Sequence, residues 1–165
     1  MDGNDLNMQG ALLPRELVED EGHKEILHLH RCVYLPLVDR GGKVPDSSGL
    51  NWGQRGVRDP DEAYISIPSK IRNGYPGFFP SIGERFELMT DDGQSLVGVR
   101  AQDDGKALET PEGNAILGRY FRNRLGVPPG QPVTAADLHA YGRLDVGFTK
   151  VGERRYWMEF GKPAK

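Results

Sequence analysis

The stretch SGLNWGQRGVR, from Ser48 to Arg58, carries side chains that can read the edges of DNA bases. Arginine can donate paired hydrogen bonds to guanine, and asparagine and glutamine can pair in the same way with adenine. Three glycines in the stretch allow a backbone to approach a ligand closely. The candidate base contacts are Asn51, Gln54, Arg55 and Arg58, and the candidate phosphate contact is Ser48. The alternative is a structural loop in which Trp52 packs on the fold and the polar side chains are solvated.

A second polar segment, KALETPEGN, precedes a predicted helix. Glutamate can accept a hydrogen bond from cytosine, and a helix N-terminus can bind phosphate. In this segment we predict base contacts from Lys106, Glu109 and Asn114, and a phosphate contact from Thr110. Four more predicted phosphate contacts are Lys70, Arg72, Arg119 and Arg122. For the arginines of the helix, the alternative is a solvated face, which is the usual role of a charge run.

Catalytic patterns are absent from the sequence. It contains no GxSxG, no P-loop and no HExxH. His28, His30 and Cys32 fall on one face of a predicted strand, but three adjacent ligands on one face would make an unusual zinc site. We therefore expect no catalytic residue, no metal site and no cofactor, and we interpret the chain as a binding module.

The charge of the chain is unevenly distributed. The first 25 residues contain seven acidic and two basic residues, a local charge of −5. The formal net charge is −3, so the remaining residues carry +2, the difference between the two values. Such a weakly basic body needs specific contacts as well as phosphate attraction to bind DNA. A single cysteine and the lack of a long apolar run favour a cytoplasmic protein with no membrane partner.

Alternating apolar residues predict seven strands, over residues 27–37, 63–67, 85–90, 95–102, 107–110, 145–151 and 154–160. Helical spacing predicts one helix that starts at an Asn114 cap and stops at Gly126. A second, shorter helix is predicted from a Thr134 cap to Gly142. A small, mostly antiparallel barrel with two short helices fits this order best. We expect an acidic leader or linker over residues 1–26 and the folded domain over 27–165.

Several segments together resemble the C-terminal DNA-binding domain of restriction endonucleases of the NgoFVII and BfiI type. They are SGLNWGQR, DPDEAYISIPSKI, FELMTDDGQ, KALETPEGNAILGRYFRNRLGV, YGRLDVGFTKV and YWMEF, and the similarity covers roughly residues 33–160. The resemblance implies a mostly β fold, a seven-stranded open pseudobarrel with two short α-helices that is akin to the plant B-three domain. It also implies an N-arm from Ser47 to Arg58 and a C-arm from Lys106 to Asn114 that grip the major groove.

The resemblance further implies sequence-specific recognition of double-stranded DNA, as the target-recognition domain of a restriction endonuclease whose nuclease domain is a separate unit. We expect double-stranded DNA as the partner, with a nuclease domain or a helicase subunit of the same system as a further one. Three alternatives remain open: a metal-dependent phosphodiesterase, a protein-interaction module and a reader of modified bases. The first would hold its metal through His28, His30 or a carboxylate pair.

Overall fold

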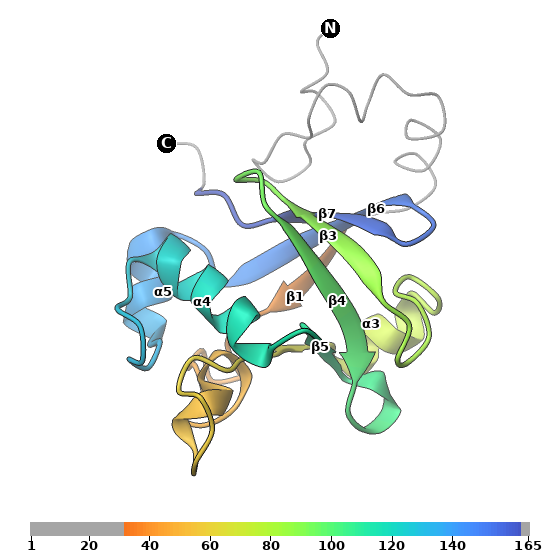
Figure 1. Ribbon diagram of the computed structural model, residues 1–165. Coiled ribbons are helices and arrows are strands. Elements are labelled where there is room, and N and C mark those ends of the chain that lie inside the picture. The colour runs from red at the N-terminus through yellow and green to blue at the C-terminus, as the bar shows by residue number, and fades with distance from the viewer. Residues whose placement is uncertain (1–31, 163–165) are drawn as a thin grey trace, which may run out of the picture.

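The computed structural model describes residues 32–162, and its strands follow one another around a hydrophobic core (Figure 1). The strands are β1 (Val33–Pro36), β2 (Ile65–Ser66), β3 (Phe86–Thr90), β4 (Ser95–Ala101), β5 (Ala107–Glu109), β6 (Asp145–Gly152) and β7 (Arg155–Glu159). They form a seven-stranded sheet in the order β1-β6-β7-β3-β4-β5-β2. Neighbouring strands run antiparallel except β3 and β7, which run parallel. The predicted mostly β fold with seven strands is confirmed.

The sheet curls into a nearly closed barrel with one open seam. Its two end strands, β1 and β2, contact each other, but the described ladders do not join them. They are also consecutive in sequence, so the segment that connects them crosses this seam. The predicted open pseudobarrel is therefore confirmed.

Alternation along the strands fills the barrel. In β1 the side chains of Val33 and Leu35 are buried in the core, and that of Tyr34 lies on the other face. Aromatic rings of Phe79, Phe86 and Tyr156 pack against one another inside, with centroids 5.1–5.8 Å apart. The predicted part of this strand before Cys32, with Leu27 and Leu29, lies outside the described residues.

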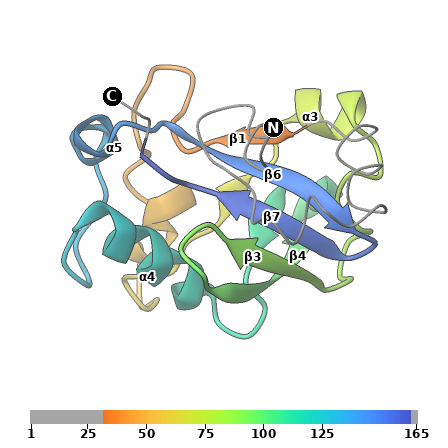
Figure 2. The same ribbon diagram turned by 90° about the horizontal axis from the view of Figure 1, so that it is seen from above.

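Helices flank the barrel on two sides (Figures 1 and 2). On one side lie α4 (Asn114–Leu125) and α5 (Ala135–Tyr141), which correspond to the two predicted helices. On the other side lies α3 (Ser69–Gly74), which the sequence did not predict. Two 3-10 turns, η2 (Gly49–Gln54) and η3 (Asp103–Gly105), complete the structure. Within residues 32–162 we find no helix long and apolar enough to cross a membrane.

The predicted helix ends are largely correct. Gly126 and Gly142 end α4 and α5 in the left-handed conformation, and Thr134 caps α5 in a capping box with Asp137. The predicted Asn114 cap is wrong, because Asn114 is the first helical residue and Gly113 occupies the cap position.

Candidate nucleic-acid interface

The two polar segments found in the sequence lie along the lower edge of the barrel in Figure 1. The N-arm, residues Ser47–Arg58, contains η2 and connects β1 to β2 across the seam. The predicted C-arm, Lys106–Asn114, mostly forms part of the barrel wall instead of projecting from it, because β5 occupies its first half and α4 begins at its end. The part that projects is the turn before it, residues 102–106, which we call the β4–β5 turn.

Asn51 is a structural residue of the N-arm. Its side chain is 2% exposed. Nδ2 donates to the carbonyl oxygens of Pro45 and Val133 at 2.9 and 2.8 Å, and Oδ1 accepts from the Val133 amide at 2.7 Å. The side-chain amide thus ties the arm to the segment between α4 and α5. With its hydrogen-bonding groups in use, Asn51 has none left for a base edge, so we no longer count it among the base contacts.

Arg122 is also structural, because its side chain points inward from α4. It is 2% exposed, and its Nε lies 3.1 Å from Oδ1 of Asp61 and donates to the Gln131 carbonyl at 2.9 Å. Burial lowers the pKa of this guanidinium, and the charges of Asp61 and Asp59 oppose that shift. The same Asp61 oxygen accepts from the Gly130 amide at 2.7 Å. A phosphate could not reach Arg122 in this arrangement, so the predicted phosphate contact is withdrawn.

Two glycines let the end of the N-arm pack so closely. A Cβ on Gly118 of α4 would lie 1.6 Å from the Asp61 carbonyl oxygen, and one on Gly53 would lie 2.0 Å from that of Asp59. The glycine at 53 was predicted to allow close approach to a ligand. In the structure it allows close approach to the chain itself.

Thr110 and Arg119 are less available than predicted. Thr110 is buried, and its hydroxyl donates to the Gly113 carbonyl at 2.7 Å just before α4. This bond fixes the turn that begins the helix, so we withdraw Thr110 as a phosphate contact. Arg119 is exposed, but its Nη2 lies 2.8 Å from Asp59 and its Nε 3.3 Å from Asp61.

Three predicted base contacts of the N-arm remain at the surface, namely Gln54, Arg55 and Arg58. Gln54 is half-buried, and its Nε2 donates to the carbonyls of Pro60 and Gly130 at 2.9 and 3.2 Å. The guanidinium of Arg58 lies 4.0 Å from the centre of the Trp52 ring and 2.7 Å from Glu62. Arg58 is therefore exposed but held in place.

Arg55 differs from these residues because no described acidic side chain forms an ion pair with it. The residue is exposed, and its Nε donates to the Ser47 carbonyl at 3.0 Å. Among residues 32–162 it has no ion-pair partner. The remaining guanidinium nitrogens can therefore act on a ligand.

The β4–β5 turn adds a residue that sequence reasoning missed. Gln102 is exposed and donates from Nε2 to Glu109 Oε2 at 3.0 Å, so an amide and a carboxylate stand side by side. Its backbone has φ 65° and ψ 177°, a region that glycine normally occupies. Lys106 is exposed beside them and lacks an ion-pair partner in the described part of the chain. The sequence signal was the turn DDGK, which draws attention to residues after Gln102 rather than to Gln102.

The last four predicted contacts lie at the edges of this surface or away from it. Ser48 is half-buried at the start of η2, and Asn114 is half-buried at the start of α4. Lys70 and Arg72 belong to α3, on the other flank of the barrel from α4 (Figure 2). Arg72 donates from Nε to the Ile67 carbonyl at 3.0 Å, whereas Lys70 is exposed.

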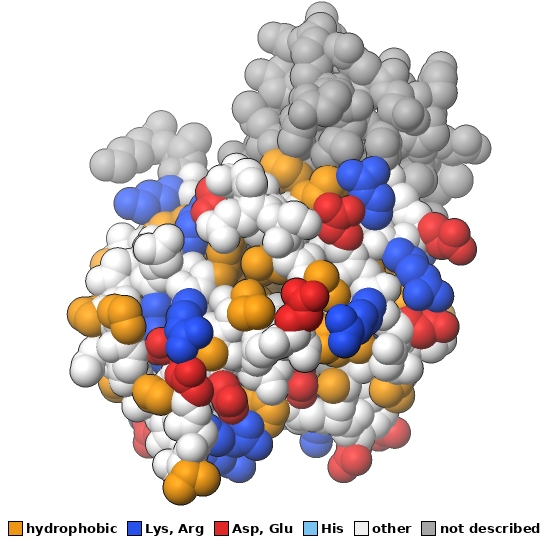
Figure 3. All heavy atoms as spheres, in the orientation of Figure 1, with side chains coloured by type: hydrophobic (Ala, Val, Ile, Leu, Met, Phe, Trp, Pro, Cys, Tyr) orange, Lys and Arg blue, Asp and Glu red, His pale blue; other side chains and the backbone are white. Residues whose placement is uncertain are grey.

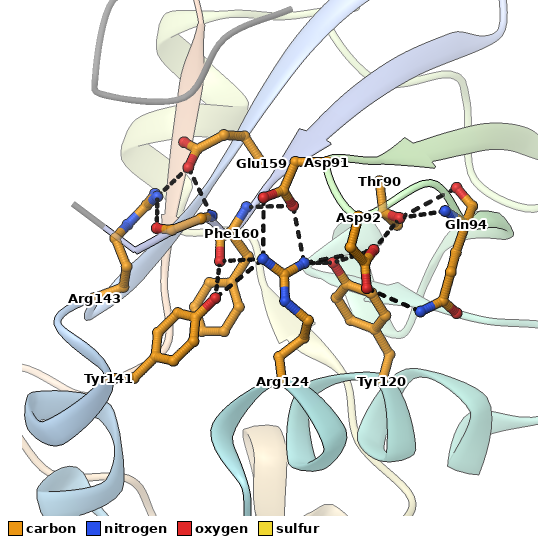
Figure 4. A network of polar contacts seen from close by, with 11 residues as sticks. Thr90, Asp91, Asp92, Gln94, Tyr120, Arg124, Tyr141, Arg143, Glu159 and Phe160 are labelled. Atoms are coloured by element: carbon orange, nitrogen blue, oxygen red, sulfur yellow. Dashed lines mark hydrogen bonds and ion pairs between the residues drawn. The ribbon is translucent and has the colours of Figure 1, made fainter. Parts of the chain in front are cut away.

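A polar network holds α4 in place beneath the β3–β4 turn (Figure 4). The guanidinium of Arg124 makes paired bonds of 2.9 and 3.0 Å to Asp91, and it also donates to the Tyr141 hydroxyl and the Phe160 carbonyl. Burial alone would lower the pKa of Arg124, but the bonds to Asp91 raise it above its usual value. Because the N-arm is attached to α4, this network indirectly fixes the arm.

The surface around the arms carries both signs of charge. Figure 3 shows acidic and basic side chains interspersed over the visible face rather than separated into patches. Such a surface offers little general attraction for phosphates and favours specific contacts. Within residues 32–162 we find no group of three histidine, cysteine or acidic side chains that could hold a metal ion. His28 and His30 lie outside the described residues.

Comparison with known proteins identifies the family. The profile of the NgoFVII C-terminal B3-like DNA-binding domain matches residues 26–152. No curated protein matches the chain significantly. The matched range spans most of the sequence and includes both polar segments, so the predicted resemblance is confirmed. The chain belongs to the family of NgoFVII C-terminal B3-like DNA-binding domains, and its role is DNA recognition.

Proposed function

We propose that the chain is the target-recognition domain of a restriction endonuclease and that it reads double-stranded DNA in the major groove between the N-arm and the β4–β5 turn. One observation carries the proposal. Arg55 on the N-arm and Lys106 at the β4–β5 turn are exposed and lack ion-pair partners within the described chain, whereas Arg58 and Arg119 are paired with acidic side chains. Free cations on both projections suit a ligand that carries negative charge between them.

Around these cations stand the groups that could distinguish bases. Glutamine can pair with adenine, arginine with guanine and glutamate with cytosine. The proposed base contacts are Gln54, Arg55, Arg58, Gln102, Lys106, Glu109 and Asn114. Gln54 would take part through its Oε1 as an acceptor, because both of its N–H groups already donate to backbone carbonyls. The proposed phosphate contacts are Ser48, Lys70, Arg72 and Arg119. Cleavage is left to a nuclease domain outside this chain.

The bond between Gln102 and Glu109 supports a reading role. A glutamine that donates to a neighbouring carboxylate has its amide orientation fixed before a ligand arrives, so little conformational entropy is lost on binding. Arg58 is prepared in the same way by Trp52 and Glu62. Fixed donors and acceptors discriminate best between bases, since a wrong base leaves them unpaired.

Selection from a random duplex library, followed by sequencing, tests the function. We expect enrichment of a short site of a few base pairs. A flat distribution of sequences would contradict sequence-specific recognition. In parallel, incubation with plasmid and Mg²⁺ or Zn²⁺ should leave the plasmid intact, because cleavage is assigned elsewhere.

Fluorescence anisotropy with the enriched duplex tests the residue roles. Arg55→Ala should weaken binding by about 1–3 kcal/mol and relax the preference at one base pair. Lys70→Ala should weaken binding to all sequences alike and reduce the salt slope by about one. Arg154→Ala, in the β6–β7 turn and paired with Glu84, is the matched control and should change neither. Equal effects of Arg55→Ala on selected and random duplexes would refute the assignment of Arg55 to a base.

A further inference from the structure

Val57 of the N-arm is fully exposed. Among residues 32–162 it has the largest exposure of any large apolar side chain, at 106%, and Ile82 follows at 56%. The described chain therefore shields no part of it. Single apolar residues at a surface are common, so exposure alone indicates no function. The turn that carries Val57 distinguishes it from the other exposed apolar residues.

This turn is fixed on both sides of Val57. Before it, Nε of Arg55 donates to a backbone carbonyl of the same arm at 3.0 Å. After it, the guanidinium of Arg58 lies 4.0 Å from the centre of the Trp52 ring. Between them Gly56 has φ 59°, a left-handed conformation that glycine adopts without strain. The turn therefore presents Val57 in a defined position, between two positively charged side chains that suit a polyanion.

A valine side chain in this position can recognise one kind of group on a base edge. Its methyl groups neither donate nor accept hydrogen bonds, so they cannot pair with the nitrogen and oxygen atoms of the bases. In the major groove the apolar group on a base edge is the C5-methyl group of thymine. The base 5-methylcytosine carries the same group at the same ring position. Because valine is short and stiff at χ1, it loses little side-chain freedom when such a contact forms.

We propose that Val57 contacts the C5-methyl group of a pyrimidine, in thymine or in 5-methylcytosine, when the N-arm lies in the major groove. This inference rests on the proposed function and adds an apolar contact to the polar contacts proposed there. Two residues separate Val57 from Arg55, so their Cα atoms lie at most about 7 Å apart, which is about two base-pair steps. Allowing for the length of the arginine side chain, the pyrimidine lies within about three base pairs of the pair that Arg55 reads.

Single-atom changes in the DNA test this contact. In the duplex enriched by selection, each thymine is replaced in turn by deoxyuridine, which lacks the methyl group and keeps the hydrogen-bonding edges. Each cytosine is replaced in turn by 5-methylcytosine. Anisotropy titrations should reveal a position at which the methyl group strengthens binding by about fourfold, the effect of about one buried methyl group. Weaker binding to deoxyuridine identifies thymine as the source, and tighter binding after methylation identifies 5-methylcytosine.

Variants of Val57 show whether this residue makes the contact. In Val57→Ala the methyl effect should disappear, because the shorter side chain no longer reaches the methyl group. The matched control, Val57→Ile, keeps a branched apolar side chain and should retain the effect. Both variants should unfold in urea at the same midpoint as the parent, since nothing in the described chain packs on Val57.

The possible failures of this inference and of the proposed function are distinct. If the enriched duplex contains no methyl-dependent position, or if the methyl effect persists in folded Val57→Ala, the inference is overturned and sequence-specific recognition stands. A flat result in the selection itself would refute the proposed function, and this inference with it.

Discussion

Replacing Asn51 with alanine should destabilise the fold, because the residue connects two distant segments. The three shortest hydrogen bonds of its side chain, at 2.7, 2.8 and 2.9 Å, are with the Val133 amide, the Val133 carbonyl and the Pro45 carbonyl. Alanine removes all three. It also leaves the peptide groups of buried Val133 without these partners, since water has poor access to them.

The size of the effect follows from these contacts. A buried hydrogen bond contributes about 1 kcal/mol net, and a buried group left unpaired costs about 1–3 kcal/mol. We therefore expect a loss of about 3 kcal/mol in the free energy of unfolding. In a domain of this size each kcal/mol lowers Tm by about 2–4 °C, so Tm should fall by about 6–12 °C.

Urea denaturation followed by circular dichroism measures this loss. Asn51→Asp is the isosteric variant, which keeps the volume but loses both donors, and it should be destabilised similarly. Arg55→Ala, in the same arm but exposed, should stay within about 0.5 kcal/mol of the parent. The reasoning fails if Asn51→Ala retains full stability but no longer distinguishes the selected duplex, because Asn51 would then be a base contact after all.

Three further predictions concern the same framework. Gly118→Ala should destabilise the protein by more than about 1 kcal/mol, against the helix propensity of alanine, because its Cβ would lie 1.6 Å from the Asp61 carbonyl; Gly74→Ala, with open space around it, is the control in urea denaturation. Gln102→Gly should relieve backbone strain and raise the free energy of unfolding by about 1 kcal/mol, yet lower affinity for the selected duplex in anisotropy titrations. Burial alone would raise the pKa of Asp92, but hydrogen bonds and a nearby arginine lower it below 3.8, so its stabilising effect is present above about pH 4 and lost as the pH falls through the folded-state value. Asp92→Asn should therefore flatten the loss of stability below about pH 4 in thermal melts.

The strands could be predicted because their information is local. Alternation in sequence becomes alternation between core and surface, and the buried Val33 and Leu35 follow it. The helix α3 left no such signal, because none of its six residues is buried and it has no apolar stripe to reveal it. The cap of α4 was misplaced by one residue because asparagine favours both the cap and the neighbouring turn positions.

The candidate site was only partly predictable, because the type of a residue indicates which hydrogen bonds it can make but not whether its side chain points into the fold or toward solvent. Asn51 and Arg55 are four positions apart and equally suited to bases, yet one side chain points inward and the other outward. The partner that decides this for Asn51 is Val133, 82 positions along the chain. For Arg122 it is Asp61, similarly distant in sequence. Such tertiary pairings leave no trace in a single sequence.

Because of the open seam between β1 and β2, the N-arm and the β4–β5 turn differ in what makes them stiff. The β4–β5 turn closes a paired hairpin, so bending it strains a backbone ladder. The N-arm crosses a gap that no described ladder closes. Two main-chain bonds, from Gly53 to Glu62 and from Tyr64 to Gly49, join the arm to the segment that follows it. Side chains attach this region to the rest of the domain, chiefly Asn51 to Val133 and Asp61 to Arg122. Single substitutions away from the tip of the N-arm can therefore change its stiffness. The stiffness of the β4–β5 turn depends mainly on the backbone hydrogen bonds between β4 and β5.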